Sequence, residues 1–189
     1  GACADPGVEP ATLLVPAPVV QSAACYAFKP EVTADCQDEL LTSTELAGTQ
    51  HINQIDGLYP GAAEAVRHLR EAGFATAICT NKPEGLAETL VRRLGVRDLF
   101  DSLIGADTLP TRKPDPAPYH AAVQQAGGDV ARSMLIGDTE TDRKTGLAAG
   151  VPVALVTFGP EGAGVARLSP EALLDHYDDL HGLVARLLG

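Results

Sequence analysis

Residues 133–150 read SMLIGDTETDRKTGLAAG, and they carry the clearest sign of the fold. It opens with a short apolar run, which suits a strand buried on both faces of a parallel sheet. Residues 142–149 suit a helix, and Gly150 follows them as glycine often follows a helix C-terminus. Acidic residues stand between the two elements. The stretch therefore predicts a buried strand and a helix joined by a turn that carries carboxylates.

The same alternation of strand and helix continues on both sides of this unit. Strands are expected at 74–80, 100–105, 133–136 and 152–158, with a short edge strand at 173–177; helices are expected at 61–71, 83–94, 116–126, 142–149 and 180–188. Such alternation predicts an α/β fold with a doubly wound parallel sheet. Right-handed crossovers place the carboxyl ends of all strands at one edge, where ligands of open α/β sheets bind.

The first 57 residues have a different character. Pro16 and Pro18 interrupt the apolar run 13–20, and proline is rarely tolerated in a central strand. Residues 33–46 can form one amphipathic helix. We therefore expect an irregular N-terminal segment at 1–57, holding a remnant of a first strand and of a helical cap, and an α/β core at 58–189. Because 57 residues are few for a strand and a cap domain, we expect this segment to be abnormal or truncated.

Composition excludes several classes of partner. The net charge is −11, which argues against nucleic acid and against an anionic membrane surface as partners. No apolar stretch approaches the roughly 20 residues of a membrane span. The cysteines show neither Cys-x-x-Cys spacing nor a zinc pattern, so we expect reduced thiols and a cytoplasmic setting. The sequence leaves the oligomeric state open.

Two acids mark the end of the strand at 133–136. Asp138 and Asp142 lie four residues apart at a helix start, so both carboxylates point to one side. Paired carboxylates form a hard oxygen site that suits Mg²⁺. Gly137 allows the backbone to approach a ligand closely. The alternative is that Asp138 only caps the helix, because aspartate is a favoured N-cap residue.

A hydroxyl marks the end of the strand at 74–80. Thr80 and Asn81 precede Lys82 and Pro83, where the next helix begins. A hydroxyl and free backbone N–H groups at a helix N-terminus can bind phosphate, so Thr80 and Asn81 are candidate substrate-binding residues. The alternative is again capping, with Thr80 or Asn81 as N-cap and Pro83 near the first helical position.

A lysine stands in a stiff loop between these two segments. Lys113 is followed by Pro114 and, two residues later, by Pro116, which restrict the backbone around it. A lysine ammonium held in this way suits a phosphate oxygen. The alternative is a solvated loop lysine, and solvation is what we expect for Arg112.

In this order the three segments resemble the second, third and fourth motifs of the haloacid dehalogenase (HAD) superfamily, and the resemblance covers residues 59 to 158. The sequence is similar to that of phosphoglycolate phosphatases at residues 59–61 (YPG), 79–83 (CTNKP), 105–107 (GAD), 113–118 (KPDPAP) and 137–142 (GDTETD). The resemblance implies a Rossmann-like core and a Mg²⁺-dependent phosphatase. Such an enzyme would hydrolyse a small phosphomonoester through a phospho-aspartate.

The resemblance also implies roles for the candidate catalytic residues. Thr80 would bind the phosphate, and Lys113 would bind the phosphate and the nucleophile. Asp138 would bind the metal, and Asp142 would bind the metal or a water molecule on it. These roles follow from matching positions in the motifs.

The first motif of the superfamily, Asp-x-Asp-Gly-Thr with the nucleophile, is not found. Residues 13–18 read LLVPAP, with prolines where the acids would stand. Asp56 has the Asp-Gly half of the motif but follows Gln54, and we interpret it as a turn residue. The chain is thus a truncated or rearranged phosphatase, a catalytically inactive relative, or a chain whose first residues differ from the natural protein. The alternative function is a non-catalytic HAD-like module that binds a phosphate ligand or a partner protein.

Overall fold

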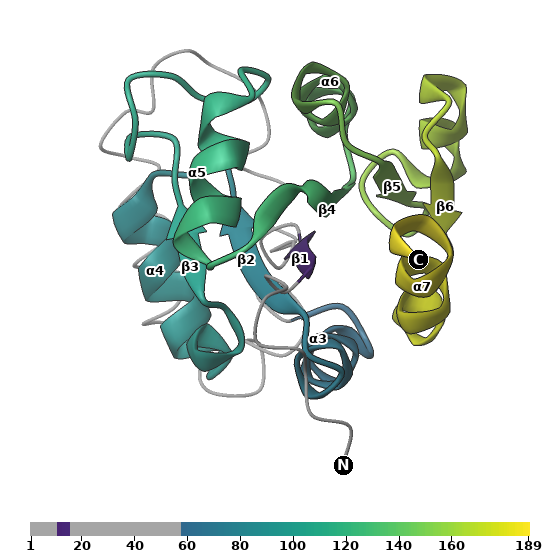
Figure 1. Ribbon diagram of the computed structural model, residues 1–189, viewed down its shortest axis with the longest axis horizontal. Helices are drawn as coiled ribbons and strands as arrows, with labels where there is room; N and C mark the ends of the chain where they lie inside the picture. Colours follow the sequence, from purple (N-terminus) through teal and green to yellow (C-terminus); the bar gives the residue numbers. More distant parts are fainter. Residues whose placement is uncertain (1–10, 16–57) are drawn as a thin grey trace, which may run out of the picture. The chain divides into compact units, whose positions relative to one another are not determined.

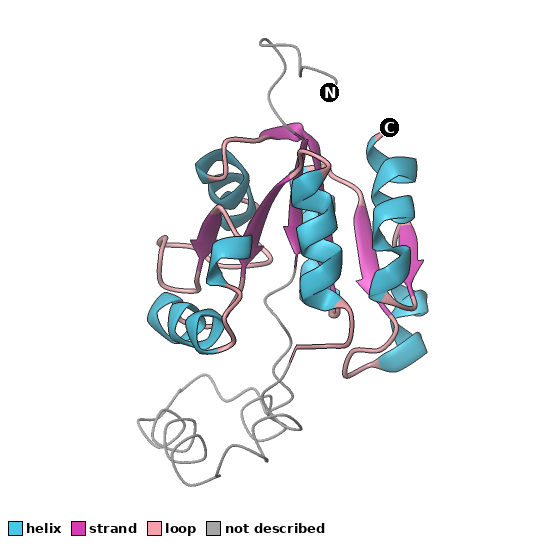
Figure 2. Cartoon of the chain, turned by 90° about the horizontal axis from the view of Figure 1, so that it is seen from below, coloured by secondary structure: helices cyan, strands magenta, loops and turns pink. Residues whose placement is uncertain are grey.

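A six-stranded parallel sheet forms the centre of the computed structural model, which describes residues 11–15 and 58–189. Its strands are β1 (Ala11–Val15), β2 (Ala75–Cys79), β3 (Ser102–Ile104), β4 (Asp129–Gly137), β5 (Val153–Val156) and β6 (Ala172–Leu174). Their order across the sheet is β3-β2-β1-β4-β5-β6, and every neighbouring pair is parallel. Figure 2 shows the strand arrows running the same way, so all carboxyl ends share one edge.

Helices cover both faces of this sheet. The described helices are α3 (Ala62–Glu71), α4 (Glu84–Arg93), α5 (Ala117–Gln125), α6 (Glu140–Ala149) and α7 (Leu180–Leu188), with the 3-10 helices η1 (Arg97–Leu99), η2 (Gly162–Leu168) and η3 (Tyr177–Asp179). Figure 1 shows α5 and α6 on one side of the sheet and α3 and α7 on the other. The doubly wound α/β fold expected from the sequence is confirmed.

The sequence pattern explains why these elements hold together. All five residues of β2 are buried, as expected for a strand that is covered on both faces. On α3 the buried residues are the predicted apolar face: Ala62, Ala65, Val66 and Leu69. On the α5 side, Tyr119 and Val123 pack into a cluster with apolar residues of β2, β4 and β5. This packing fixes the strand ends that carry the polar residues.

β1 is the middle strand of the sheet. Leu13 pairs with Thr76 of β2 on one side and with Met134 of β4 on the other. The strand ends at Val15, so Pro16 and Pro18 follow it in the sequence and remove no donor from its ladder. The chain divides into two compact units, residues 1–17 with 60–189 and residues 18–59. The helix expected at 33–46 lies outside the described residues.

Some element boundaries differ from the expectation. β4 begins at Asp129, four residues before the predicted start. Its first half was not predicted as strand because it is polar and partly exposed, and it joins β1 through a register shift. α6 begins at Glu140 instead of 142, because Thr139 is its N-cap. The three 3-10 helices were not predicted. Within residues 11–15 and 58–189, no helix has the length and apolar character needed to cross a membrane.

Candidate functional site

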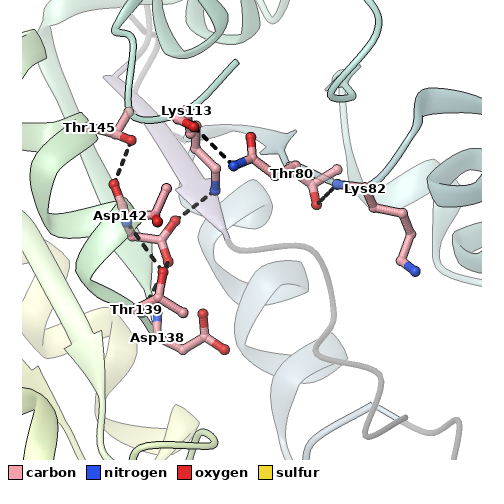
Figure 3. Close-up of polar contacts among 9 residues, drawn as sticks. Thr80, Lys82, Lys113, Asp138, Thr139, Asp142 and Thr145 are labelled. Atoms are coloured by element: carbon pink, nitrogen blue, oxygen red, sulfur yellow. Dashed lines mark hydrogen bonds and ion pairs between the residues drawn. The ribbon is translucent and has the colours of Figure 1, made fainter. Parts of the chain in front are cut away.

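The predicted polar residues meet at the carboxyl edge of the sheet. β1 lies between β2 and β4. Thr80 directly follows β2, Asp138 directly follows β4, and Lys113 stands in the loop between β3 and α5. Figure 3 shows the side chains of Lys113, Asp138 and Asp142 close together, with Thr80 beside them. Three segments far apart in the sequence therefore supply one group of polar side chains.

A buried ion pair lies at the centre of this group. The Nζ of Lys113 is 2.6 Å from Oδ1 of Asp142, and these side chains are only 10% and 5% exposed. Burial alone would lower the pKa of Lys113, but the Asp142 carboxylate, together with the neighbouring Cys79 and Asp138, raises that pKa above its usual value. Burial would likewise raise the pKa of Asp142, but Lys113 and the hydrogen bonds to its carboxylate lower it. Both groups are therefore charged, and Lys113 is not the solvated lysine of the alternative interpretation.

The second oxygen of Asp142 is held by the turn that starts α6. Oδ2 accepts hydrogen bonds from the backbone N–H groups of Asp138 (3.1 Å) and Thr139 (3.2 Å) and from the Thr139 hydroxyl (2.8 Å). Thr139 is the N-cap of α6 and forms a capping box with Asp142. The helix is thus capped by Thr139, and the interpretation of Asp138 as the cap is wrong.

Gly137 is needed for this arrangement. A Cβ atom on Gly137 would lie 2.2 Å from Cβ of Asp142 and 2.5 Å from its Cγ. Any side chain at this position would displace Asp142 from the turn. Gly137 was expected to let a ligand approach the backbone, but in the structure the Asp142 side chain occupies that space.

Within the described residues Asp138 forms no ion pair, and the Lys113 ammonium near it is paired with Asp142. The exposed fraction of Asp138 is 9%, and no dashed line reaches its carboxylate among the residues drawn in Figure 3. Burial, and then the neighbouring Asp142 carboxylate, raise the pKa of Asp138 to about 7. The loop after β5 lies against it, because a Cβ on Gly159 would be 3.0 Å from Cβ of Asp138. A nearly buried carboxylate in this state suits a cation.

The turn after β2 presents the Thr80 hydroxyl. Its Oγ1 accepts a hydrogen bond from the Lys82 backbone N–H at 3.1 Å, which leaves the hydroxyl proton for another acceptor. The N-cap of α4 is Pro83, so neither Thr80 nor Asn81 caps that helix. The Asn81 side chain instead donates to the Lys113 carbonyl at 3.0 Å and joins the two loops.

Sequence reasoning missed several residues that shape this site. Thr139 was quoted within a motif but was given no role, although a threonine three residues before an aspartate is a capping-box signal. Asp107, which contacts the start of α4, was quoted only as part of a resemblance, and Thr108, which contacts Glu84, was not noted at all. Cys79 is not one of the missed residues, because its apolar strand predicts a buried thiol. The thiol is free and lies buried beside the pair, and burial raises its pKa to about 11, so it is inert.

The described residues contain no group of three or more His, Cys, Asp or Glu side chains that could hold a metal ion. A metal bound by Asp138 would therefore have at most two such ligands from this part of the chain. Mg²⁺ accepts such a site, because it is usually held by one or two carboxylates together with water and substrate phosphates.

Arg112, in the same loop as Lys113, is exposed, as expected.

Comparison with known proteins gives consistent results. Residues 20–150 match the model of the haloacid dehalogenase-like hydrolases. The chain is 42% identical over 134 residues to a phosphoglycolate phosphatase from Cereibacter sphaeroides, with 71% of this chain and 61% of that protein covered. A phosphoglycolate phosphatase from another strain of that species is 39% identical, and 82% of this chain and 68% of that protein are covered. The chain thus spans only 61% of the length of the first of these relatives.

A solved structure agrees on the fold. A protein from Haemophilus somnus, described as a predicted phosphoglycolate phosphatase, superposes with a TM-score of 0.65 at 24% identity. The match covers 81% of this chain and 68% of that one. At this identity the match supports the fold and carries no statement about the substrate.

Proposed function

Because the chain belongs to the haloacid dehalogenase-like hydrolase family, we propose that it is a Mg²⁺-dependent phosphatase of small phosphomonoesters, with 2-phosphoglycolate as the leading substrate. The observation that carries the proposal is the buried Lys113–Asp142 pair beside Asp138 and Thr80 at one edge of the sheet. The substrate is suggested by the name of the relatives from Cereibacter sphaeroides.

The metal would be held by Asp138. Its carboxylate is nearly buried and its pKa is raised to about 7, so a cation beside it would offset an unfavourable charge. Asp142 contributes indirectly, because its oxygens already accept from Lys113 and from the α6 turn. A bound Mg²⁺ would neutralise phosphate oxygens during transfer.

The chain's own residues would bind and orient the phosphate. Lys113 supplies a permanent positive charge that Asp142 keeps in place. Thr80 supplies a hydroxyl proton whose direction is set by the hydrogen bond from the Lys82 N–H. Asn81 supports the site by holding the Lys113 loop, and it also remains a candidate contact to substrate. Groups fixed in this way stabilise charge on a transferring phosphoryl group without reorganising.

The attacking carboxylate is the part that this site does not supply. In the proposed mechanism an aspartate attacks phosphorus and displaces the alcohol of the phosphomonoester, whose oxygen takes up a proton, so that a phospho-aspartate forms. Water then attacks the phosphoryl group, releases phosphate and restores the aspartate. Asp142 is paired with Lys113, and we assign Asp138 to the metal. No acid follows β1 in the sequence until Glu31, so the nucleophile would come from elsewhere in the N-terminal segment. We expect the enzyme to work in the cytoplasm, without nucleic acid or membrane partners.

The test is a phosphatase assay of the purified chain with a panel of phosphomonoesters that includes 2-phosphoglycolate, with and without Mg²⁺. If an acid from residues 1–57 reaches the site, we expect phosphate release that depends on Mg²⁺ and is lost in Lys113→Met. Leu147→Gln, an exposed change on α6, is the matched control and should keep the wild-type rate. Mg²⁺-dependent phosphate binding without any turnover would identify a non-catalytic module, and absence of both would refute the proposal.

A further inference from the structure

The loop that follows β3 is hydrogen-bonded to the start of α4. The Glu84 backbone N–H donates to Oδ1 of Asp107 at 2.7 Å, and the Ala106 N–H donates to the Lys82 carbonyl at 3.0 Å. One step earlier, the Thr80 N–H donates to the Ile104 carbonyl at 2.9 Å. The turn 80–84 is therefore tied to residues 104–107 at successive points. We call this set of contacts the α4 clamp.

Two further features close the clamp. A Cβ on Gly105 would lie 2.3 Å from the Glu84 nitrogen and 2.5 Å from its Cα, so only glycine allows the two backbones to approach this closely. The Thr108 hydroxyl accepts from the Gly105 N–H at 2.8 Å and donates to the Glu84 carboxylate. Thr108 thus links the two sides of the clamp through a single oxygen.

Local capping does not explain these contacts. The N-cap of α4 is Pro83, which has no side chain able to accept from the first N–H groups of the helix. Asp107 takes that role from another loop, and its negative charge faces the positive end of the helix dipole. A residue that only had to cap α4 could stand at position 83, whereas Asp107 also fixes the distance between the two loops.

We infer that Asp107 is a positioning residue for the phosphate-binding turn, an inference that rests on the proposed role of Thr80. By holding Glu84, Asp107 sets where the preceding Thr80 hydroxyl and the Lys82 N–H lie. The hydrogen bond that Asp107 accepts from the Glu84 N–H is what holds the turn. The charge of Asp107 is unfavourable for a neighbouring phosphate, so an uncharged acceptor at position 107 should serve equally well.

The test compares Asp107→Ala, which removes the acceptor, with Asp107→Asn, which keeps an acceptor and removes the charge. Asp98→Ala makes the same change at an exposed aspartate of η1 and is the control. The first measurement is amide hydrogen exchange without ligand. We expect Asp107→Ala to lose protection at Glu84 and Lys82 while protection at Val91 persists, and we expect Asp107→Asn and Asp98→Ala to match wild type.

The second measurement is calorimetric titration with inorganic phosphate in the presence of Mg²⁺. Asp107→Ala should bind phosphate roughly tenfold more weakly, because small displacements of binding groups are costly. Asp107→Asn should bind at least as tightly as wild type, and Mg²⁺ affinity without phosphate should be the same in all variants. A purely structural role would lower protection at Glu84 in Asp107→Ala without changing its affinity for phosphate.

The outcomes separate the two proposals. If wild type does not bind phosphate, the proposed function fails and takes the inference with it. If wild type and Asp107→Ala bind phosphate equally, only the inference fails and Asp107 is reduced to a helix cap. Should Asp107→Ala not fold, Thr108→Val breaks the link between Gly105 and Glu84 and is held to the same expectation of weakened phosphate binding.

Discussion

Lys113 Nζ lies 2.6 Å from Asp142 Oδ1, and this contact joins the loop before α5 to the first turn of α6. Neither side chain has substantial access to water. The pair is therefore a permanent part of the folded protein, and it holds a positive charge at the carboxyl edge of the sheet. Each residue is needed to keep the other charged in place.

Removing one member of this pair should destabilise the protein strongly. Asp142→Ala leaves the Lys113 ammonium buried without a partner, which typically costs about 3–5 kcal/mol of unfolding free energy. Urea unfolding measures the loss. Lys144→Ala breaks the pair with Glu140, whose side chains are more than half exposed, and should leave stability nearly unchanged. Equal losses in the two variants would contradict the structure.

Gly137→Ala should disturb the same pair through sterics. The added Cβ would lie 2.2 Å from Cβ of Asp142, so the α6 turn must shift. We expect a loss of about 1–3 kcal/mol, as for other overpacked sites. Gly182→Ala in α7 is the control, since nothing lies within 4 Å of a Cβ there. That change should stabilise by up to about 1 kcal/mol through helix propensity. Thermal unfolding of both variants measures these changes, and equal midpoints in the two variants would contradict the prediction.

Stability should fall with rising pH because of Asp138. Burial and the Asp142 carboxylate raise its pKa from 3.8 to about 7 in the folded protein. Between these values the folded protein keeps a proton that the unfolded chain has released, so stability decreases as pH rises and the loss is complete above about pH 7. Asp138→Asn lacks this contribution. In urea unfolding between pH 4.5 and 8, the unfolding free energy of the variant should increase relative to that of wild type as pH rises. A difference in unfolding free energy that does not change with pH would argue against a raised pKa.

Mg²⁺ affinity should depend on Asp138 more than on Asp142. We expect Asp138→Ala to abolish binding, because it removes the carboxylate that would contact the ion. Asp142→Asn should weaken binding less, since its oxygens accept from Lys113 and from the α6 turn. Calorimetric titration with Mg²⁺ gives both affinities. Wild-type affinity in Asp138→Ala would remove Asp138 from the metal site.

Turnover should depend on an acid from the N-terminal segment. Thr80, Lys113 and Mg²⁺ can stabilise a transferring phosphoryl group, but none of them attacks phosphorus. Loss of a nucleophile costs about 10⁶-fold in kcat in subtilisin. We therefore expect no appreciable turnover unless one of the acids in residues 1–57 reaches the site: Asp5, Glu9, Glu31, Asp35, Asp38, Glu39, Glu45 or Asp56.

A single-turnover assay with acid quench tests this expectation. Trapped phosphoprotein would be digested to locate the modified residue, and Asp98→Asn would serve as a control at an acid on the surface of η1. Finding phospho-aspartate within residues 1–57 would identify the nucleophile, and finding it within 58–189 would show that its expected origin is wrong.

The sequence predicted the core well because apolar periodicity reports burial directly. The buried face of α3 and the buried strand β2 agree with the pattern. The first half of β4 could not be found in this way, because Asp129 to Arg132 carry polar or partly exposed side chains and join the sheet through backbone pairing. The middle strand β1 was obscured by the prolines that follow it.

The site was predicted as a set of residues but not as a set of contacts. Spacing placed Asp138 and Asp142 on one side of a turn, yet it could not show that Asp142 would pair with Lys113 from another loop. The side-chain bond from Asn81 to the Lys113 carbonyl and the contact of Asp107 with Glu84 also join separate loops. Their catalytic roles remain predictions.

The middle position of β1 has a consequence for the order of folding. Leu13 pairs with Met134, so the chain must be synthesised at least as far as β4 before this strand can gain both of its neighbours. Until then β1 can pair only with β2, and its other edge has no partner strand. Contacts between such distant residues slow folding, and the waiting strand edges are exposed to other chains. The protein's yield in cells should therefore depend on protection of these edges during synthesis.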